Sequence, residues 1–304
     1  MRPPAEIADA VAALRGGGLV ILPTETVYGL AADAADPVAV AHIFEAKGRP
    51  RFNPLIAHVA DQAEAQRIAV FDERAQALAD AFWPGPLTLV LPIRGVEAVC
   101  ELARAGLETV AVRMPGHPLM QEVLTAFGGP VVAPSANRSG RPSPTTYDDA
   151  LTETGSAAAA ALDGGPCQVG LESTVVALLD RARLLRPGAV TRTQIEAVVG
   201  PLAEAEDDAR RSPGRLALHY APDAPVRINA EAARDGEVYL GFGTPGPFTL
   251  SENGDLTEAA ANLFRRLREA DATRPAGIAV APIPTEGLGE AINDRLKRAA
   301  GFVG

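Results

Sequence analysis

The segment 131–146 constrains the fold of this chain most, because it joins a buried strand to a rigid polar loop. Val131 and Val132 are β-branched and apolar, as at the end of a buried strand, and Pro134 stops that strand. The glycine and prolines that follow exclude a helix. The loop carries hydroxyl, amide and guanidinium groups: Ser135, Asn137, Arg138, Ser139, Arg141, Ser143 and Thr145. Such loops often form anion or nucleotide sites in α/β proteins, although this segment alone is equally compatible with a solvated surface loop.

The same pattern recurs at other predicted strands, which also end in hydroxyl or cationic side chains. These strand ends carry Thr24 and Thr26, Arg113, Ser173 and Thr174, and Arg186. Arg113 precedes a Pro-Gly turn, which makes it a candidate clamp for a carboxylate. Because strand ends in an α/β sheet can meet in one cleft, the pattern predicts a site for a polyanionic ligand and a small polar one. It shows no obvious general base.

A cluster of cations follows the predicted helix 37–47. The chain has only two lysines, and one of them, Lys47, stands in the sequence Lys-Gly-Arg-Pro-Arg that ends this helix. Three cations in five residues suit a phosphate-binding loop, in which Arg49 would offer bidentate contacts and Lys47 a point charge. The alternative is a solvated helix C-terminus, where cations favour the helix dipole. His58, in the next predicted strand, is more typical of a packed core histidine than of a ligand.

Length and composition bound the class of protein. At roughly 150 residues per domain, the 304 residues predict two domains: a catalytic domain over 1–200, a linker over 201–223 and a small α/β domain over 224–304. The net charge of −10 argues against non-specific nucleic-acid binding as the main activity. No apolar run is long enough to span a membrane, and the N-terminal residues are too acidic for a signal peptide. We therefore expect a cytoplasmic α/β enzyme.

Several common motifs are absent or out of context. The two cysteines and four histidines have no metal-ligand spacing, so we expect no metal held by the protein alone. There is no P-loop, no Gly-x-Ser-x-Gly elbow and no His-Glu-x-x-His pair. A Gly-x-Gly-x-x-Gly match over 241–246 does not open a helix, because prolines and β-forming residues follow it.

Seven ordered segments together resemble the threonylcarbamoyl-AMP synthases. They are 23–30, 47–50 with 53–55, 83–88, 109–115, 133–137, 170–174 and 185–188. The resemblance implies a YrdC-like fold, with a twisted mixed sheet around a large cleft. The linker and the last 80 or so residues resemble the longer form of the family, which adds a small Rossmann-like C-terminal α/β domain.

The resemblance also implies an activity and its site. The family makes threonylcarbamoyl-AMP and pyrophosphate from L-threonine, bicarbonate and ATP with Mg²⁺, and the product passes to a tRNA-modifying threonylcarbamoyl transferase that acts beside the anticodon. By motif, ATP would be bound by Arg49, Asn53, Thr109, Ser135, Asn137, Ser143 and Arg186. Threonine would be bound by Thr26, His58, Arg113, Ala133 through its backbone, and Ser173. Lys47 and Arg49 would act in catalysis by offsetting the phosphate charge.

One departure from the family and two alternatives stay open. Arg215, Leu216 and Ala217 stand where the family linker often carries Met, Lys and Tyr, which leaves His219 and Tyr220 as substitutes for that tyrosine. A double-stranded RNA or tRNA-binding module is one alternative, because a basic cleft suits a duplex backbone. Another is a carbamoyl-adenylate transferase of the same fold that uses carbamoyl phosphate, against which the expected His58 and Arg113 argue.

Overall fold

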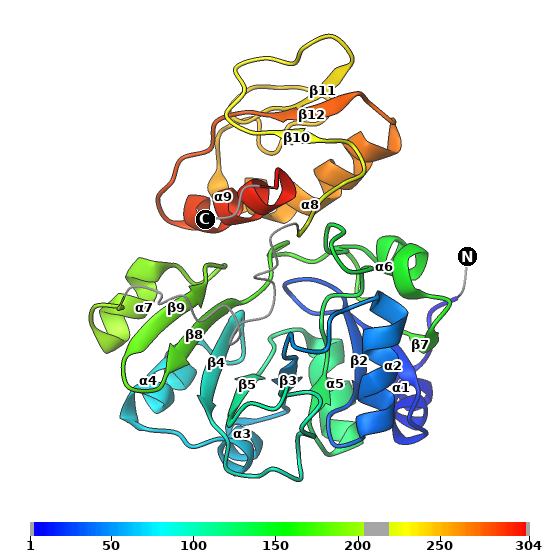
Figure 1. Ribbon diagram of the computed structural model, residues 1–304, viewed down its shortest axis with the longest axis vertical. Coiled ribbons are helices and arrows are strands. Elements are labelled where there is room, and N and C mark those ends of the chain that lie inside the picture. The colour runs from blue at the N-terminus through cyan, green and yellow to red at the C-terminus, as the bar shows by residue number, and fades with distance from the viewer. Residues whose placement is uncertain (1–2, 204–218, 302–304) are drawn as a thin grey trace.

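The computed structural model describes residues 3–203 and 219–301, which fold into two α/β units (Figure 1). The larger unit is built on a nine-stranded sheet in the order β7-β1-β2-β6-β3-β5-β4-β8-β9. Its strands are β1 (Leu19–Leu22), β2 (Gly29–Asp33), β3 (Ile56–His58), β4 (Leu87–Pro92), β5 (Thr109–Arg113), β6 (Val131–Val132), β7 (Ala158–Ala161), β8 (Thr174–Leu178) and β9 (Ala182–Arg186). Strand β5 pairs in parallel with β3 and antiparallel with β4, so the sheet is mixed as predicted.

The helices of the larger unit begin and end at residues suited to those places. They are α1 (Ile7–Arg15), α2 (Pro37–Lys47), α3 (Gln62–Ile68), α4 (Glu73–Phe82), α5 (Pro118–Phe127), α6 (Tyr147–Thr154) and α7 (Arg192–Val199). In α2, the Asp36 side chain accepts a hydrogen bond from the backbone N–H of Val38, and Pro37 occupies the first turn. Gly48 ends the helix in the left-handed region with φ of 59°. The helix therefore stops between Lys47 and Arg49, which lie on opposite sides of this turn.

Alternation along the strands produces separate cores on the two faces of the sheet. In β1, Leu19 and Ile21 join the largest core, whereas Val20 and Leu22 pack with residues of α1 and α5. A third, small apolar cluster contains Ile56 of β3, with Val90, Ala111, Val175, Ala177 and Leu185. This cluster matters for function, because Ile56 also lines the cavity described below.

The smaller unit, named here the C-terminal domain, carries a three-stranded parallel sheet in the order β10-β12-β11. Its elements are β10 (Val226–Arg227), β11 (Glu237–Leu240), α8 (Leu256–Ala272), β12 (Gly277–Val280) and α9 (Leu288–Ala299). Helix α8 connects the parallel strands β11 and β12, which makes a βαβ unit. The predicted small Rossmann-like domain is thereby confirmed.

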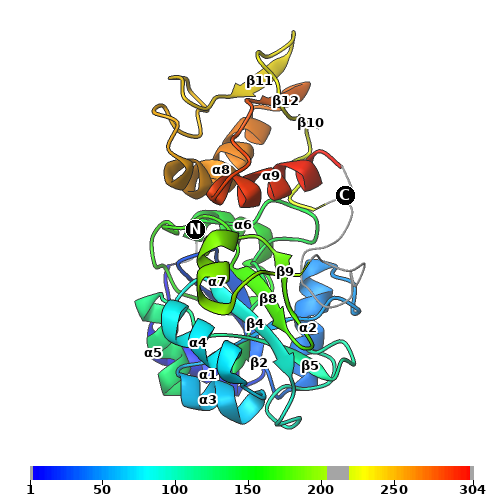
Figure 2. The same cartoon turned by 90° about the vertical axis from the view of Figure 1, so that its left-hand side faces the viewer.

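Helices α8 and α9 lie on the side of the C-terminal domain that faces the larger unit (Figures 1 and 2). Val27 and Leu171 of the larger unit are buried in the core of the C-terminal domain together with Phe264. Arg268 of α8 forms an ion pair with Glu153 of α6 at 2.9 Å. The two units therefore share both apolar and charged contacts.

The sequence located most of these elements, with some differences. Strand β2 was not predicted, whereas α2 has the bounds of the predicted helix 37–47. Residues 215–217, where the sequence departs from the family pattern, lie outside the described residues. The domain boundaries at 200 and 223 stay predictions, since residues 204–218, most of the predicted linker, also lie outside the described residues. Among the described residues, no helix is long and apolar enough to cross a bilayer.

Candidate active site

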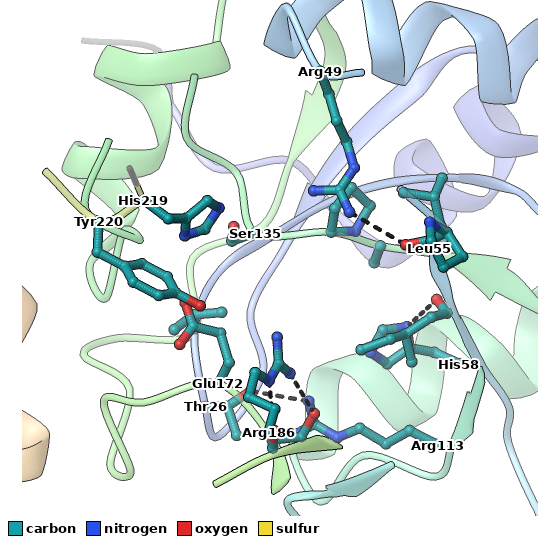
Figure 3. Close-up of a pocket in the computed structure, with 16 residues that line it drawn as sticks. Thr26, Arg49, Leu55, His58, Arg113, Ser135, Glu172, Arg186, His219 and Tyr220 are labelled. Carbon is teal, nitrogen blue, oxygen red and sulfur yellow. Dashed lines mark hydrogen bonds between the residues drawn. The ribbon is translucent and has the colours of Figure 1, made fainter. Parts of the chain in front are cut away.

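A small cavity lies where several strand ends of the larger unit meet the start of the C-terminal domain (Figure 3). It is lined by Thr26, Val27, Arg49, Pro54, Leu55, Ile56, His58, Arg113, Ala133, Pro134, Ser135, Glu172, Ser173, Arg186, His219 and Tyr220. Eight predicted site residues are thus brought together: Thr26, Arg49, His58, Arg113, Ala133, Ser135, Ser173 and Arg186. The free volume is about 50 Å³, enough for a few water molecules and well below that of a typical small-molecule pocket.

Arg113, at the end of β5, is held by three hydrogen bonds. Its Nε donates to the carbonyl of Gly85 at 3.1 Å, and its Nη1 donates to Oγ1 of Thr26 at 3.0 Å. Its Nη2 pairs with Oε1 of Glu25 at 2.6 Å. The Arg113 side chain is only 4 % exposed, so these bonds hold its guanidinium in one orientation at the cavity wall.

His58, at the end of β3, is neutral at physiological pH. Burial, and secondarily the charge of Arg113, lower the pKa of His58 to about 3. Its Nδ1 lies 3.1 Å from the carbonyl oxygen of Ile56. The ring therefore offers the cavity a polar, uncharged surface rather than a cation.

Arg186 and Ser173 form one hydrogen-bonded unit at the start of β8 and the end of β9. Arg186 donates from Nε to the backbone carbonyl of Ser173 at 3.0 Å and from Nη2 to its Oγ at 3.1 Å. The Ser173 hydroxyl also lies 2.7 Å from Oγ1 of Thr88, which is fully buried. Thr88 was not predicted as a site residue, although it ends one of the family-like segments.

Arg49 reaches the cavity from the turn after α2 (Figure 3). It donates to the carbonyl oxygens of Asn53 at 3.4 Å and of Pro54 at 3.2 Å. Burial lowers its pKa to about 10, so it remains a cation at neutral pH. Arg49 and Arg186 thus place two buried positive charges on one cavity, as an anion site requires.

Lys47 does not line this cavity, in contrast to Arg49. Its buried Nζ donates to the backbone carbonyls of Ser135 and Asn137, and its own carbonyl accepts from the N–H of Ser139 at 2.8 Å. Burial lowers the pKa of Lys47 well below its usual value. Lys47 therefore joins α2 to the polar loop, and its predicted contact with phosphate stays a prediction.

Four other predicted ATP ligands, Asn53, Thr109, Asn137 and Ser143, are not among the residues that line the cavity. Asn137 donates from Nδ2 to the carbonyls of Arg138 and Arg141, which shapes the loop. Ser143 donates to Oε1 of Glu172 at 2.5 Å. Asn53 directly precedes the lining residue Pro54, whereas Thr109 begins β5 at the opposite end of that strand from Arg113.

Glu172, His219 and Tyr220 also line the cavity. Glu172 was not predicted, whereas His219 and Tyr220 were the expected substitutes for the linker tyrosine of the family. The rings of His219 and Tyr220 meet edge to face with centroids 4.0 Å apart, and both side chains are buried. Burial and the nearby cations Arg49 and Lys47 lower the pKa of His219 well below its usual value. The signal for Glu172 was its position directly before Ser173 in a family-like segment, whereas nothing local predicts where residues 219 and 220 pack.

Comparison with known proteins identifies the family. A family model described as telomere recombination matches residues 12–188, and one described as the C-terminal domain of threonylcarbamoyl-AMP synthase matches residues 190–301. A Bacillus subtilis protein named threonylcarbamoyl-AMP synthase is 40 % identical, over 97 % of this chain and 93 % of its own. The chain belongs to the threonylcarbamoyl-AMP synthase family. The fold class and the two-domain form predicted for this family are confirmed.

Two solved structures of Pyrococcus abyssi Sua5 cover nearly the whole synthase chain. One, a complex with L-threonine, has a TM-score of 0.86 at 37 % identity and covers 97 % of this chain and 94 % of its own. The other is a variant of that protein in which two consecutive residues, a histidine and a tyrosine, are replaced by alanine. It has a TM-score of 0.88 at 38 % identity, with 97 % and 93 % covered.

Proposed function

We propose that this chain synthesises threonylcarbamoyl-AMP and pyrophosphate from L-threonine, bicarbonate and ATP. The carrying observation is one buried cavity that combines a fixed Arg113, hydroxyl groups and two further arginines. Full-length relatives of this name, and the threonine complex of the Pyrococcus abyssi Sua5, support threonine as the small polar ligand. The net negative charge of the chain disfavours contact with the phosphates of an RNA duplex, and the cavity is too small to hold one. The RNA-binding alternative therefore receives no support.

The threonine end of the cavity would be formed by Arg113 and its neighbours. Arg113 would bind the threonine carboxylate, while Thr26 and Ser173 supply hydroxyls and Ala133 supplies backbone groups. His58 would remain uncharged beside them, because its pKa is about 3.

The ATP end would be formed by Arg49, Arg186 and Ser135, with Asn53 beside them, while the role of Thr109 rests on the family resemblance alone. Asn53 supports this role, because its Oδ1 is buried and has no hydrogen-bond partner in the described structure. Arginine suits phosphate because its planar fork can make two parallel hydrogen bonds. Lys47 and Asn137 would act indirectly, by holding the loop that carries Ser135.

Mg²⁺ would enter with the nucleotide. Among the described residues, no group of three His, Cys, Asp or Glu side chains could hold a metal ion. The one carboxylate in the lining, Glu172, already accepts hydrogen bonds on both oxygens, from Ser143 and from Arg295. The donor set therefore fits an ion held by phosphate oxygens and water, which lowers the charge of the triphosphate.

The reaction then needs mainly positioning and charge compensation. The threonine amine attacks the carbon of bicarbonate, and loss of water leaves a carbamate. A carbamate oxygen attacks the α-phosphorus of ATP, and the bond from that phosphorus to the bridging oxygen breaks, so pyrophosphate leaves. Fixed arginines can stabilise the charge that develops on the phosphates without reorganising. The product, an activated carbamoyl group, would be consumed by a transferase that acts on tRNA.

The test is pyrophosphate release with ATP and Mg²⁺, omitting threonine or bicarbonate in turn. The proposal expects release only when both are present. Arg186→Met should lower kcat/KM by about a hundredfold, as expected when a buried cation at a transferred phosphate is lost. Arg181→Met, which removes an exposed arginine five residues away, is the matched control and should behave like the unchanged chain. Release without threonine would contradict the proposal.

A further inference from the structure

The larger unit supplies most of the cavity lining, yet one fully buried side chain of the C-terminal domain stands directly behind it. Arg295 of α9 is 0 % exposed. Its Nε donates to Oε2 of Glu172 at 3.0 Å, and its Nη1 donates to the carbonyl of Pro187 at 2.7 Å. Its guanidinium carbon lies 5.5 Å from the centre of the Tyr220 ring. One side chain thus contacts three segments that carry cavity residues.

Each of these contacts is with a residue that lines the cavity or is next to one that does, at the proposed ATP end. Glu172 lines the cavity, and its other oxygen accepts from Ser143 of the polar loop. Pro187 directly follows Arg186, so a bond to its carbonyl fixes the backbone that carries this arginine. Tyr220 forms the wall opposite His58 in Figure 3. Without Arg295, these segments would lose their common anchor.

The charge of Glu172 makes the contact more than structural. Glu172 is 6 % exposed and faces a cavity built for an anion. An unpaired buried carboxylate there would repel the phosphates of ATP and would itself be costly. Arg295 offsets that charge from behind, where it cannot compete with Arg49 or Arg186 for the ligand.

We infer that Arg295 is a positioning residue for ATP, through which the C-terminal domain becomes a structural part of the active site. It anchors Glu172, the backbone after Arg186 and the Tyr220 ring, and it neutralises the Glu172 carboxylate. This inference rests on the synthase function proposed above, and it assigns the C-terminal domain a role in the reaction itself rather than only in folding.

The test compares Arg295→Met with Arg192→Met. Arg192 of α7 forms another ion pair between the two units, with Glu290 of α9 at 2.8 Å, but this pair is partly exposed and neither residue lines the cavity. Arg295→Met should raise the KM for ATP about tenfold or more and change the KM for threonine less than about twofold. Arg192→Met should change neither. Equal effects of the two variants, or equal shifts of both KM values, would overturn the inference.

A second variant separates charge compensation from a general loss of structure. Adding Glu172→Gln to Arg295→Met removes the unpaired carboxylate, and most of the ATP affinity should return. A double variant no better than Arg295→Met contradicts the charge argument. If Arg295→Met does not fold, as judged by circular dichroism, Arg295→Lys replaces it. Lysine keeps the charge but not the paired contacts, and an unchanged KM for ATP would then overturn the inference.

Direct binding distinguishes this inference from the proposed function. Calorimetry with a non-hydrolysable ATP analogue reports affinity without turnover. If the unchanged chain releases no pyrophosphate in the presence of threonine and bicarbonate, the proposed function fails. If the analogue binds equally well to the Arg295→Met and Arg192→Met variants, the role of Arg295 fails.

Discussion

Glu25 and Arg113 form a buried ion pair in which only one carboxylate oxygen is used. Oε1 of Glu25 lies 2.6 Å from Nη2 of Arg113, whereas Oε2 is buried with no hydrogen-bond partner in the described structure. Together with bonds to Thr26 and Gly85, this pair fixes the guanidinium before any ligand arrives. The carboxylate also limits the net positive charge at the proposed threonine end.

Arg113→Lys should therefore weaken threonine binding selectively. A lysine cannot reach Gly85, Thr26 and Glu25 at once, and it lacks the planar fork that matches a carboxylate. We expect the KM for threonine to rise about thirtyfold while the KM for ATP changes less than about twofold. Steady-state pyrophosphate release at varied threonine and varied ATP checks this. A larger rise in the KM for ATP than in the KM for threonine would contradict the assignment of Arg113 to threonine.

Lys47→Met should cost stability, because two buried carbonyls would lose their donor. We expect the free energy of unfolding to fall by about 2–4 kcal/mol, which urea denaturation can measure. The other lysine in the chain, Lys297, is exposed on α9. Lys297→Met is the control and should change stability by less than about 0.5 kcal/mol. Equal losses in the two variants would show that the bonds of Lys47 to Ser135 and Asn137 contribute little.

His58 should make the folded chain sensitive to acid. Its pKa is about 3 in the folded state against an ordinary value of 6.5, so between these values the unfolded chain binds a proton that the folded chain does not. Stability from this group is complete above pH 6.5 and falls as the pH falls, by about 2 kcal/mol at pH 5. His58→Asn should remove that part of the decline between pH 7 and pH 5 in urea denaturation. An unchanged slope would contradict the pKa.

Gly170→Ala should disturb the contact between the two units. Gly170 has φ of +74°, and an added Cβ would lie 2.5 Å from Cα of Ala261 in α8. We expect the free energy of unfolding to fall by about 2–4 kcal/mol, the sum of backbone strain and overpacking. Gly128→Ala is matched, with φ of +80° and no atom within 4 Å of the added Cβ. It should lose only about 1 kcal/mol, and an equal loss at both glycines would remove the steric argument.

The sequence predicted the parts of the site that depend on local order. Thr26 follows a short apolar run, Arg113 ends one and Ser173 precedes one, and strand ends in one sheet can meet in space. Lys47 was predicted from a different pattern, the cluster of cations at the end of a helix, and its side chain donates to the backbone of a loop about 90 residues away rather than lining the cavity. The sequence alone cannot tell a cation that lines a cavity from one that is hydrogen-bonded to loop carbonyls, because both are buried and both have acceptors.

Other features depend on partners distant in sequence. Strand β2 reads Gly-Leu-Ala-Ala-Asp, without β-branched residues, and it is held by β1 and β6 on its two sides. Glu172 and Arg295 are 123 positions apart, so no periodicity relates them. Tyr220 follows a segment outside the described residues, and its left-handed φ of 63° has no local sequence cause such as glycine.

The small free volume of the cavity affects how any measured affinity is understood. At about 50 Å³ the enclosed space holds a few water molecules but not a whole nucleotide, and the buried side chains of His219 and Tyr220 form part of its wall. A nucleotide bound wholly within this space would therefore require molecules in which the cavity has opened. Its apparent dissociation constant equals the intrinsic one divided by the fraction of open molecules. Two relatives with identical ligand contacts could thus differ in ATP affinity solely because they open to different extents.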